Sequence, residues 1–449
     1  MRRRVDLHAA GRPPACVVAR LEPEPVLAFR HRDDGARHRT DAPIRNDSRR
    51  RTTMRLLVVD SMQRYRFMIR LAAAARDEFP IAFATSEPLA HFLILRAGFR
   101  SVYLRSDRRT VALADDSDWR CDDAIEVLNG RVSSERAGRE SAGIVRTIAT
   151  LLATERIAQC VMWNGQQLVC RAIAHVCAER RVPMKFLEIS NLPDKLFADT
   201  LGVNARSSIA RCPSALDHLP LPDEHQHRDW LARYERDKAR PLPQAGTSLH
   251  AILQSTVNYG MKLATRGVGR NAPDAIATRP ATVDARHTIA PDADELAARR
   301  YVFLPLQVSD DTQLKLHSEV DNLEAIDIAL RYAAHADAAL IVKVHPAERN
   351  AALVDAVLDL KRRHGFYVAT SKTVDLVKYA RLVVTINSTV GLEAMLYGKR
   401  VVPLGRCFYR SFDRDRLLRY IHAFLIDGVD YFGARAIPAQ AARRILSLD

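Results

Sequence analysis

The chain repeats one pattern through most of its length: a short apolar run followed by an amphipathic helical stretch. From Met54 the run MRLLVVD is followed by RYRFMIRLAAAARD, and similar pairs continue to about residue 190. Strands separated by helices of roughly 10–15 residues indicate a parallel sheet with both faces covered. The pattern therefore predicts a Rossmann-like domain over residues 54–212.

The same alternation resumes at residue 301, through the runs YVFLPLQV, AALIVKVHP, FYVAT and LVVTIN. It predicts a second Rossmann-like domain over residues 301–415. An α/β protein with two such domains would form a cleft between the carboxyl edges of two parallel sheets, which is where ligands bind in such folds.

Three other segments break this rhythm. Residues 1–53 have no hydrophobic period and hold 13 Arg against 7 acidic residues. We expect either a gene start placed upstream of a natural start at Met54 or a disordered basic tail. Residues 213–300, rich in Pro, Ala and charge, predict a helical linker with a flexible part near 268–292, and residues 416–449 are expected to form C-terminal helices.

The composition narrows the class of partner. With 68 basic and 53 acidic residues, the formal charge is +15. This favours a polyanionic partner such as nucleic acid, an anionic lipid surface or a phosphate-bearing substrate, and general arginine richness is the alternative. No apolar run approaches the ~18 residues of a membrane helix. The seven Cys include no CxxC pair, which is typical of a reducing cytoplasm and argues against a zinc site.

In the second domain, polar residues follow three of the apolar runs. Because the carboxyl ends of parallel strands meet at one edge of a sheet, we expect these residues to lie together. They are Gln307, Asp310, Asp311 and Thr312 after YVFLPL, Lys343 and His345 within IVKVHP, and Asn387, Ser388 and Thr389 after LVVTI.

Ser388 and Thr389 come directly before the helical run VGLEAMLYG. Backbone N–H groups at a helix start, together with the helix dipole, form a site for phosphate. Glu393, one turn further along, could hydrogen-bond a ribose. A plain N-cap is the alternative, although the capping box is missing because Gly391 stands three residues after Ser388.

Lys343 and His345 are two residues apart and therefore lie on the same side of the strand. Both can donate to one anion, and Pro346 sets the direction in which the chain leaves the strand. A structural histidine is the alternative. A Lys-x-His-Pro segment facing a Ser-Thr helix start favours an anion site.

Polar residues also end strands of the first domain: Asp60 after LLVV, Asn164 in WNG and Glu188 in LEIS. The polar loop NLPDKLFADTLGVNARS, which contains Asn204, follows Glu188. We interpret Asp60, Asn164 and Asn204 as candidates for the acceptor side of a site, and solvated loop residues are the alternative. The chain has no GxGxxG, P-loop or HExxH motif, which argues against a dinucleotide fingerprint and a catalytic metal.

Taken in order and spacing over residues 54–415, several motifs resemble the bacterial capsule polysaccharide biosynthesis family of β-Kdo glycosyltransferases, in the branch that starts the capsule lipid linker. The motifs are WNG, LEISNLPDKLFADTLGVNARS, PLQVSDDTQL, KVHP and NSTVGLEAMLYGKRVVPLGRCFY. The resemblance implies a GT-B-like fold, CMP-Kdo as donor and a phosphatidylglycerol-type lipid as acceptor. It also implies a peripheral position at the inner face of the cytoplasmic membrane, beside capsule assembly and export proteins.

The resemblance also implies roles for single residues. His345, Lys343, Ser388 and Thr389 would hold the CMP phosphate, with Gln307 and Asn387 in the same donor site and Glu393 on the ribose. Asp311 would lie near the anomeric carbon, and Glu188 would be a base for the acceptor hydroxyl. No metal cofactor is implied, because one phosphate needs only a helix N-terminus and one or two cations. Members commonly have E-x-G where this chain has Glu188-Ile189-Ser190, which bears on the shape of that loop.

Two other classes compete with this interpretation. The first is another GT-B-type enzyme, such as a CMP-sialic-acid transferase, a polyol-phosphate transferase or a UDP-sugar epimerase. The second is a basic nucleic-acid-binding protein. At 6% aromatic residues, the chain is poor in the stacking side chains that single-stranded nucleic acids need, and we expect no nucleic acid partner.

Overall fold

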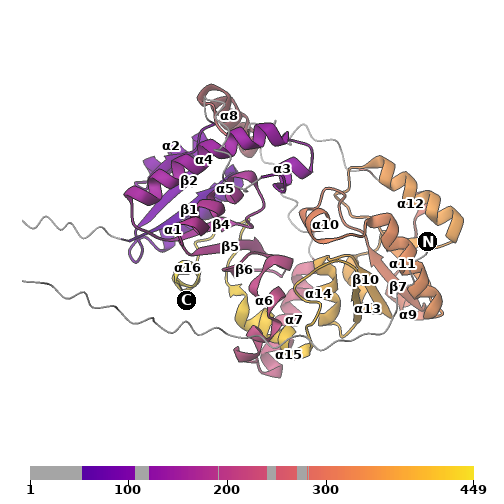
Figure 1. Cartoon of the computed structure of the whole chain (residues 1–449). Helices are drawn as coiled ribbons and strands as arrows, with labels where there is room; N and C mark the ends of the chain where they lie inside the picture. The colour runs from indigo at the N-terminus through magenta and orange to yellow at the C-terminus, as the bar shows by residue number, and fades with distance from the viewer. Residues whose placement is uncertain are drawn as a thin grey trace, which may run out of the picture. The chain divides into compact units, whose positions relative to one another are not determined.

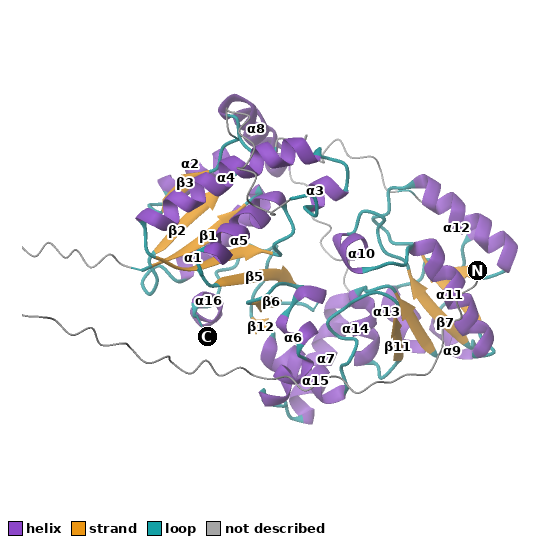
Figure 2. Cartoon of the chain, viewed as in Figure 1, coloured by secondary structure: helices purple, strands orange, loops and turns teal. Residues whose placement is uncertain are grey.

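The computed structural model describes residues 53–106, 121–190, 192–239, 249–269, 281 and 283–448. Within them the chain forms two β-sheets flanked by helices (Figures 1 and 2). Apart from residue 53, the predicted basic extension lies outside the described residues, as does much of the flexible part predicted near 268–292. Over the described parts of the chain, no helix is both long and apolar enough to cross a membrane.

The first sheet has seven strands in the order β12-β6-β5-β4-β1-β2-β3. The five strands predicted from the alternating pattern, β1 to β5, run parallel, whereas β6 and β12 run antiparallel to their neighbours. In register, Leu56 of β1 lies opposite Ala82 on one side and Cys160 on the other. The strands are β1 (Met54–Val59), β2 (Ile81–Thr85), β3 (Arg100–Tyr103), β4 (Ile157–Trp163), β5 (Met184–Ile189), β6 (Lys195–Asp199) and β12 (Ile426–Asp427).

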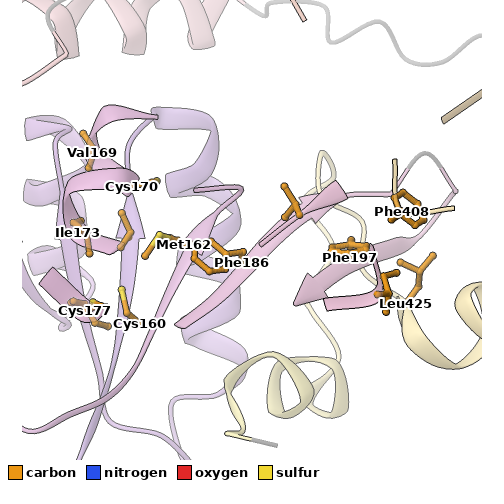
Figure 3. Close-up of a cluster of buried hydrophobic side chains, with 14 of the residues drawn as sticks. Cys160, Met162, Val169, Cys170, Ile173, Cys177, Phe186, Phe197, Phe408 and Leu425 are labelled. Atoms are coloured by element: carbon orange, nitrogen blue, oxygen red, sulfur yellow. The ribbon is translucent and has the colours of Figure 1, made fainter. Parts of the chain in front are cut away.

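Alternate residues of the central strands face two helix layers, as strand geometry requires. Leu56 of β1 and Met162 of β4 pack into the core with α4 and α5, and Figure 3 shows Met162 beside the apolar face of α5. Leu57 and Val161 pack into the opposite core with α1, α2 and α16. The helices of these layers are α1 (Met62–Ala74), α2 (Pro88–Arg96), α3 (Ile125–Leu128), α4 (Ser134–Thr154), α5 (Leu168–Glu179) and α16 (Ala439–Leu446).

The second sheet has five parallel strands in the order β11-β10-β7-β8-β9, with the first strand in the sequence at its centre. The strands are β7 (Tyr301–Pro305), β8 (Ala339–Lys343), β9 (Tyr367–Val368), β10 (Leu382–Thr385) and β11 (Arg400–Pro403). Val302 and Val342 pack against α11 and α12, whereas Phe303 and Ile341 pack against α9 and α13. The predicted fold class, α/β with two Rossmann-like halves, is confirmed.

Six helices among the described residues belong to the second sheet and its loops. They are α9 (Ala293–Ala298), α10 (Thr312–His317), α11 (Asn322–His335), α12 (Ala351–His364), α13 (Thr373–Tyr379) and α14 (Thr389–Leu396). Helix α12 ends at Gly365, whose φ of 70° is the left-handed conformation that glycine adopts at helix ends without strain. The short helix α10 is an addition that the sequence pattern did not predict.

The stretch predicted as a linker is helical and packs into the core. Helix α7 (Glu224–Ala239) buries Trp230 and Tyr234 in a cluster that also contains Phe197 of β6 and Leu392 of α14. Helix α8 (Leu249–Thr265) packs against α2. The remaining short helices are α6 (Ser208–Arg211) and the 3-10 helices Asn204–Arg206, Pro213–His218 and Ala285–His287. One core cluster contains residues of both halves. The packing therefore does not test the predicted domain boundaries, which stay predictions.

The C-terminal segment returns to the first sheet. Helix α15 (Arg414–Arg419) and the π-helix Tyr420–Phe424 lead into β12, which pairs with β6. Helix α16 then covers the face that carries α1. Near its end, the carbonyl of Leu446 accepts from Arg55 Nε at 2.8 Å, and that of Ser447 accepts from Lys185 Nζ at 2.9 Å. Residues 416–449, predicted as helices, therefore also contribute a strand.

Docking of α16 can be tested by truncating Ile445, whose side chain is fully buried. Ile445→Ala is expected to lower the free energy of unfolding by about 2–5 kcal/mol, because the lost methyl groups leave a cavity. Urea unfolding followed by circular dichroism measures this change. Gln440→Ala, at an exposed position of the same helix, is the control and should change it by less than about 0.5 kcal/mol. Equal values for the two variants would contradict the docking of α16.

Candidate functional site

Two buried amides join the loops that follow β7 and β10. Gln307 Oε1 accepts from the Asn387 backbone N–H at 3.1 Å, and Gln307 Nε2 donates to Asn387 Oδ1 at 3.0 Å. Asn387 Nδ2 donates to the Gln313 carbonyl at 2.9 Å, and Asn322 bonds both backbone groups of Gln307. The side chains of Gln307 and Asn387 thus hold the two loops together, and their predicted contact with a nucleotide stays a prediction.

Asp311 is the N-cap of α10. Its Oδ1 accepts from the Gln313 N–H at 2.8 Å, and its Oδ2 accepts from Gln307 Nε2 at 3.3 Å. The carboxylate is partly exposed. The amide network therefore also fixes Asp311 at the carboxyl edge of the second sheet, where the sequence predicts it.

His345 follows β8 on the same edge, with its side chain exposed. Its Nδ1 accepts from the Ala347 N–H at 3.1 Å, so the proton of the neutral ring sits on Nε2, which can donate to a ligand. Partial desolvation by the surrounding protein lowers the pKa of His345 below its ordinary 6.5, and the carboxylates of Asp311 and Glu348 offset only part of this lowering. At neutral pH, His345 is thus an uncharged donor within electrostatic range of Asp311.

Lys343 ends β8 and reaches the loop before α13, where its Nζ donates to the Ser371 carbonyl. Burial lowers the pKa of Lys343, and Asp375 raises it. The positive charge of Lys343 also lowers the pKa of His345. Their joint binding of one phosphate stays a prediction.

Ser388 is the N-cap of α14. Its Oγ accepts from the Val390 N–H at 3.2 Å, and its carbonyl accepts from the Tyr409 hydroxyl. A Cβ atom at Gly391 would lie 2.6 Å from the Tyr409 hydroxyl oxygen, so glycine is required there by the packing of Tyr409. Ser388 therefore caps the helix, and the predicted phosphate contacts of Ser388 and Thr389 remain open to test.

Glu393 is 5% exposed, and its Oε1 accepts from Lys238 Nζ of α7 at 2.8 Å. Burial and the nearby Glu393 charge raise the pKa of Tyr234, which also belongs to α7. The carboxylate predicted to bind the ribose thus forms an ion pair that connects α14 to α7. Its role toward a ribose stays a prediction.

In the first sheet, Asp60 follows β1 and forms an ion pair with Arg64. Its Oδ2 also accepts from the Cys170 thiol at 3.4 Å. Its Oδ1 is buried without a hydrogen-bond partner among the described residues. Asp60 therefore presents one satisfied oxygen and one oxygen that is free to accept a hydrogen bond, which is consistent with a binding role.

Glu188 is the last residue but one of β5 and pairs with Phe197 of β6. Its Oε1 accepts from the Ile189 N–H at 2.9 Å. Burial and the charge of Asp311 raise the pKa of Glu188, whereas Arg64 and Asn164 lower it. The two carboxylates predicted as catalytic come from different sheets, and each lies within electrostatic range of the other.

Asn164 and Gly165 form a tight turn after β4, with φ of 20° and 76°. A Cβ atom at Gly165 would lie 2.8 Å from the Phe186 ring, so the turn depends on glycine. Asn164 lines a pocket of about 240 Å³ together with Arg171 and Arg206. Asn204 does not line this pocket and lies in a 3-10 helix, also with positive φ. The acceptor-side roles of Asp60, Asn164 and Asn204 stay predictions.

Sequence reasoning missed one residue that shapes the site, Glu348. It is 2% exposed, and its Oε2 accepts from the Ser309 N–H and hydroxyl at 2.8 and 2.9 Å. Its Oε1 accepts from the N–H groups of Arg349 and Asn350, both at 2.8 Å. Glu348 thereby ties the loop after β8 to the loop after β7. The sequence signal is weak, because a single acid between HP and a helix N-cap is unremarkable.

The fold and these loops define an α/β protein whose polar and titratable groups gather at the carboxyl edges of two sheets. Within the described residues, no group of three or more His, Cys, Asp or Glu is placed to hold a metal ion. Residues 270–412 match the family described as capsule polysaccharide biosynthesis protein. This stretch, which covers about a third of the chain and includes β7 to β11 with Asp311, His345 and Ser388, is similar to that family, as its motifs predict.

Curated relatives match over a similar length. Protein FixF of Sinorhizobium fredii is 36% identical over 124 residues, which cover 26% of this chain and 29% of that protein. The capsule polysaccharide export protein KpsS of Escherichia coli is 29% identical over 121 residues, covering 25% of this chain and 31% of KpsS. The capsule polysaccharide modification protein LipB of Neisseria meningitidis is 29% identical over 123 residues, covering 24% and 29%. The matched part spans less than a third of each relative.

Solved structures resemble the chain loosely over most of its length. The β-Kdo 2,7 transferase of Thermosulfurimonas dismutans KpsC has a TM-score of 0.39 at 14% identity, covering 87% of this chain and 98% of its own. The UDP-GlcNAc 2-epimerase of Methanocaldococcus jannaschii has a TM-score of 0.33 at 11% identity, covering 88% and 98%. Such superpositions are too loose to transfer a site or an activity.

Glu348→Gln tests the loop connection. Hydrogen bonds to its carboxylate lower the pKa of Glu348 against the raising effect of burial. A lowered folded-state pKa adds stability above the ordinary carboxyl value and loses it as pH falls through the folded value. At pH 7 we expect the variant to be about 1–3 kcal/mol less stable, with the difference shrinking below about pH 4. Urea unfolding at several pH values measures it, and exposed Glu319→Gln should show no such pH-dependent gap.

Proposed function

We propose that this protein is a glycosyltransferase that transfers Kdo from CMP-Kdo to a phosphatidylglycerol-type lipid in the biosynthesis of the capsular polysaccharide linker. It would act at the inner face of the cytoplasmic membrane, with capsule assembly and export proteins as partners. Three groups at the two sheet edges support this most directly: the neutral donor His345, the carboxylate of Asp311 at the same sheet edge, and Glu188 from the other sheet.

In the proposed reaction, His345 Nε2–H donates to the CMP phosphate, and Lys343 and the N–H groups at the start of α14 add positive potential. CMP departs with a single phosphate, so we propose that no metal cofactor is needed. Asp311, held by the amide network, would stabilise the positive charge that develops at the anomeric carbon.

Glu188 is the proposed base on the acceptor side. The acceptor hydroxyl oxygen forms a bond to the anomeric carbon while the bond from that carbon to the CMP phosphate oxygen breaks, and the hydroxyl proton passes to Glu188. A carboxylate with a raised pKa is better matched to this proton transfer than an ordinary one. The free Oδ1 of Asp60 could accept a hydrogen bond from the acceptor.

A donor screen tests the proposal. Purified protein with a phosphatidylglycerol acceptor should release CMP from CMP-Kdo and add Kdo to the lipid, as measured by mass spectrometry. His345→Ala should abolish transfer and leave the melting temperature unchanged, because the ring is exposed. His335→Ala, an exposed histidine of the same half, is the control and should transfer normally. Turnover of CMP-sialic acid, CDP-glycerol or UDP-GlcNAc without turnover of CMP-Kdo would refute the proposal.

The base assignment makes a separate prediction. Glu188→Gln should lower kcat by about 10²–10⁴-fold while the affinity for the donor is kept. In the wild type, kcat should fall on the acid side with a midpoint above 4.5, because burial and Asp311 raise the pKa of Glu188 and the base must be deprotonated. Steady-state kinetics between about pH 4 and 9 measure the profile. An unchanged kcat in Glu188→Gln would remove Glu188 from the mechanism, and exposed Glu179→Gln is the control.

A further inference from the structure

Helix α8 has the reverse of the usual polarity, because it buries polar side chains and exposes apolar ones. Asn258 and Lys262 are only 5% and 8% exposed, whereas Leu253, Val257 and Leu263 are 62%, 45% and 51% exposed. A surface helix of a soluble protein normally turns its apolar stripe inward. The outward stripe of α8 therefore needs its own explanation.

The inward polar face of α8 is held by a carboxylate at the start of α2. Glu87 is 3% exposed, and its Oε1 accepts from Lys262 Nζ at 2.6 Å, while its Oε2 accepts from Asn258 Nδ2. Asn258 Oδ1 in turn accepts from the Leu89 N–H at 3.1 Å. Rotating α8 to bury its leucines would leave the Glu87 charge buried without partners, which is costly. The orientation is therefore built into the fold.

Helix α2 extends the apolar area. It packs beside α8 (Figure 1), and its Phe92 and Leu95 are 55% and 49% exposed. Isolated exposed apolar residues are ordinary, but a set of large ones on two packed helices is typical of an interaction site. We call these five side chains, Phe92, Leu95, Leu253, Val257 and Leu263, the α2–α8 surface.

The two chain segments that form this surface, residues 88–105 and 249–269, contain basic residues and no acidic ones. Arg96, Arg105 and Arg266 are exposed in these stretches. Apolar side chains beside basic ones match a bilayer with anionic headgroups, where leucine and phenylalanine enter the boundary of the acyl chains and arginine meets phosphate.

We propose that the α2–α8 surface docks on an anionic lipid bilayer. A second copy of this chain is a poorer occupant, because pairing the surface with itself would bring like charges together. Glu87, which holds α8, follows β2, and Asp60 follows the neighbouring strand β1, so α8 is anchored at the same sheet edge as Asp60. This deepens the proposed use of a lipid acceptor by naming the face that meets the membrane.

Vesicle co-sedimentation of the full chain tests the proposal without any nucleotide sugar. The protein should bind vesicles of phosphatidylcholine containing phosphatidylglycerol, and binding should weaken as NaCl rises from about 0.1 M to 1 M, where the Debye length falls from about 10 to 3 Å. Leu253→Ser combined with Val257→Ser should weaken binding by about tenfold or more. Phe92→Ser, on the other helix, should weaken it as well.

The control is Leu221→Ser, at an exposed leucine before α7 that is 44% exposed. It should bind vesicles as the wild type does, and thermal melts should show that all variants fold. Failure of the wild type to bind anionic vesicles would overturn the proposal, as would wild-type binding by both the double variant and Phe92→Ser. A dimer that forms with the wild type and is lost in the double variant would also overturn the proposal. Vesicle binding does not depend on Kdo transfer, so absence of transfer would refute the proposed function without refuting the proposed membrane-docking surface.

Discussion

The reciprocal hydrogen bonds between Gln307 and Asn387 set the geometry on which the second sheet's edge depends. Each buried hydrogen bond contributes only about 0.5–1.5 kcal/mol, but a partner left unsatisfied costs about 1–3 kcal/mol. Because the two amides satisfy each other, the loops after β7 and β10 can meet in a buried place. Asp311 then takes its position from the same network, and Glu348 adds the loop after β8.

The first sheet is completed by residues from the far end of the chain. Strand β12 extends it beyond β6, and α16 covers the face that carries α1. The core cluster in Figure 3 continues from Met162 and Phe186 to Phe197, Phe408 and Leu425, which come from distant parts of the sequence. Aromatic contacts such as Phe197 with Phe424, at 5.3 Å between ring centres, join β6 to the C-terminal segment. Glu188 lies in β5, the neighbour of β6, so contacts of this kind connect the strand of Glu188 to the C-terminal third of the chain.

Apolar periodicity was enough to predict the alternation of strands and helices in both halves, including β1 and β7 to β10. It failed for β6, because Lys195 and Asp199 interrupt the apolar pattern. Lys195 is buried and paired with Asp427 at 3.3 Å, and Asp199 accepts from the Leu201 and Ser208 backbone N–H groups. These partners come from a turn and from the C-terminal strand, so the local sequence pattern does not predict that Lys195 and Asp199 are buried in a strand.

The sequence by itself determined the parallel strands of both sheets and the edge at which Asp311 and His345 lie, because both follow from local periodicity and from the rule that parallel strands end at the same edge. Only the tertiary structure decided which polar groups form hydrogen bonds or ion pairs within the protein. Gln307, Asn387 and Glu393 have partners 80 and 155 residues away, and pairing over such separations depends on packing. The outward apolar face of α8 was likewise decided in three dimensions, because the buried Glu87 binds Lys262 and Asn258 and so turns the polar side of the helix inward.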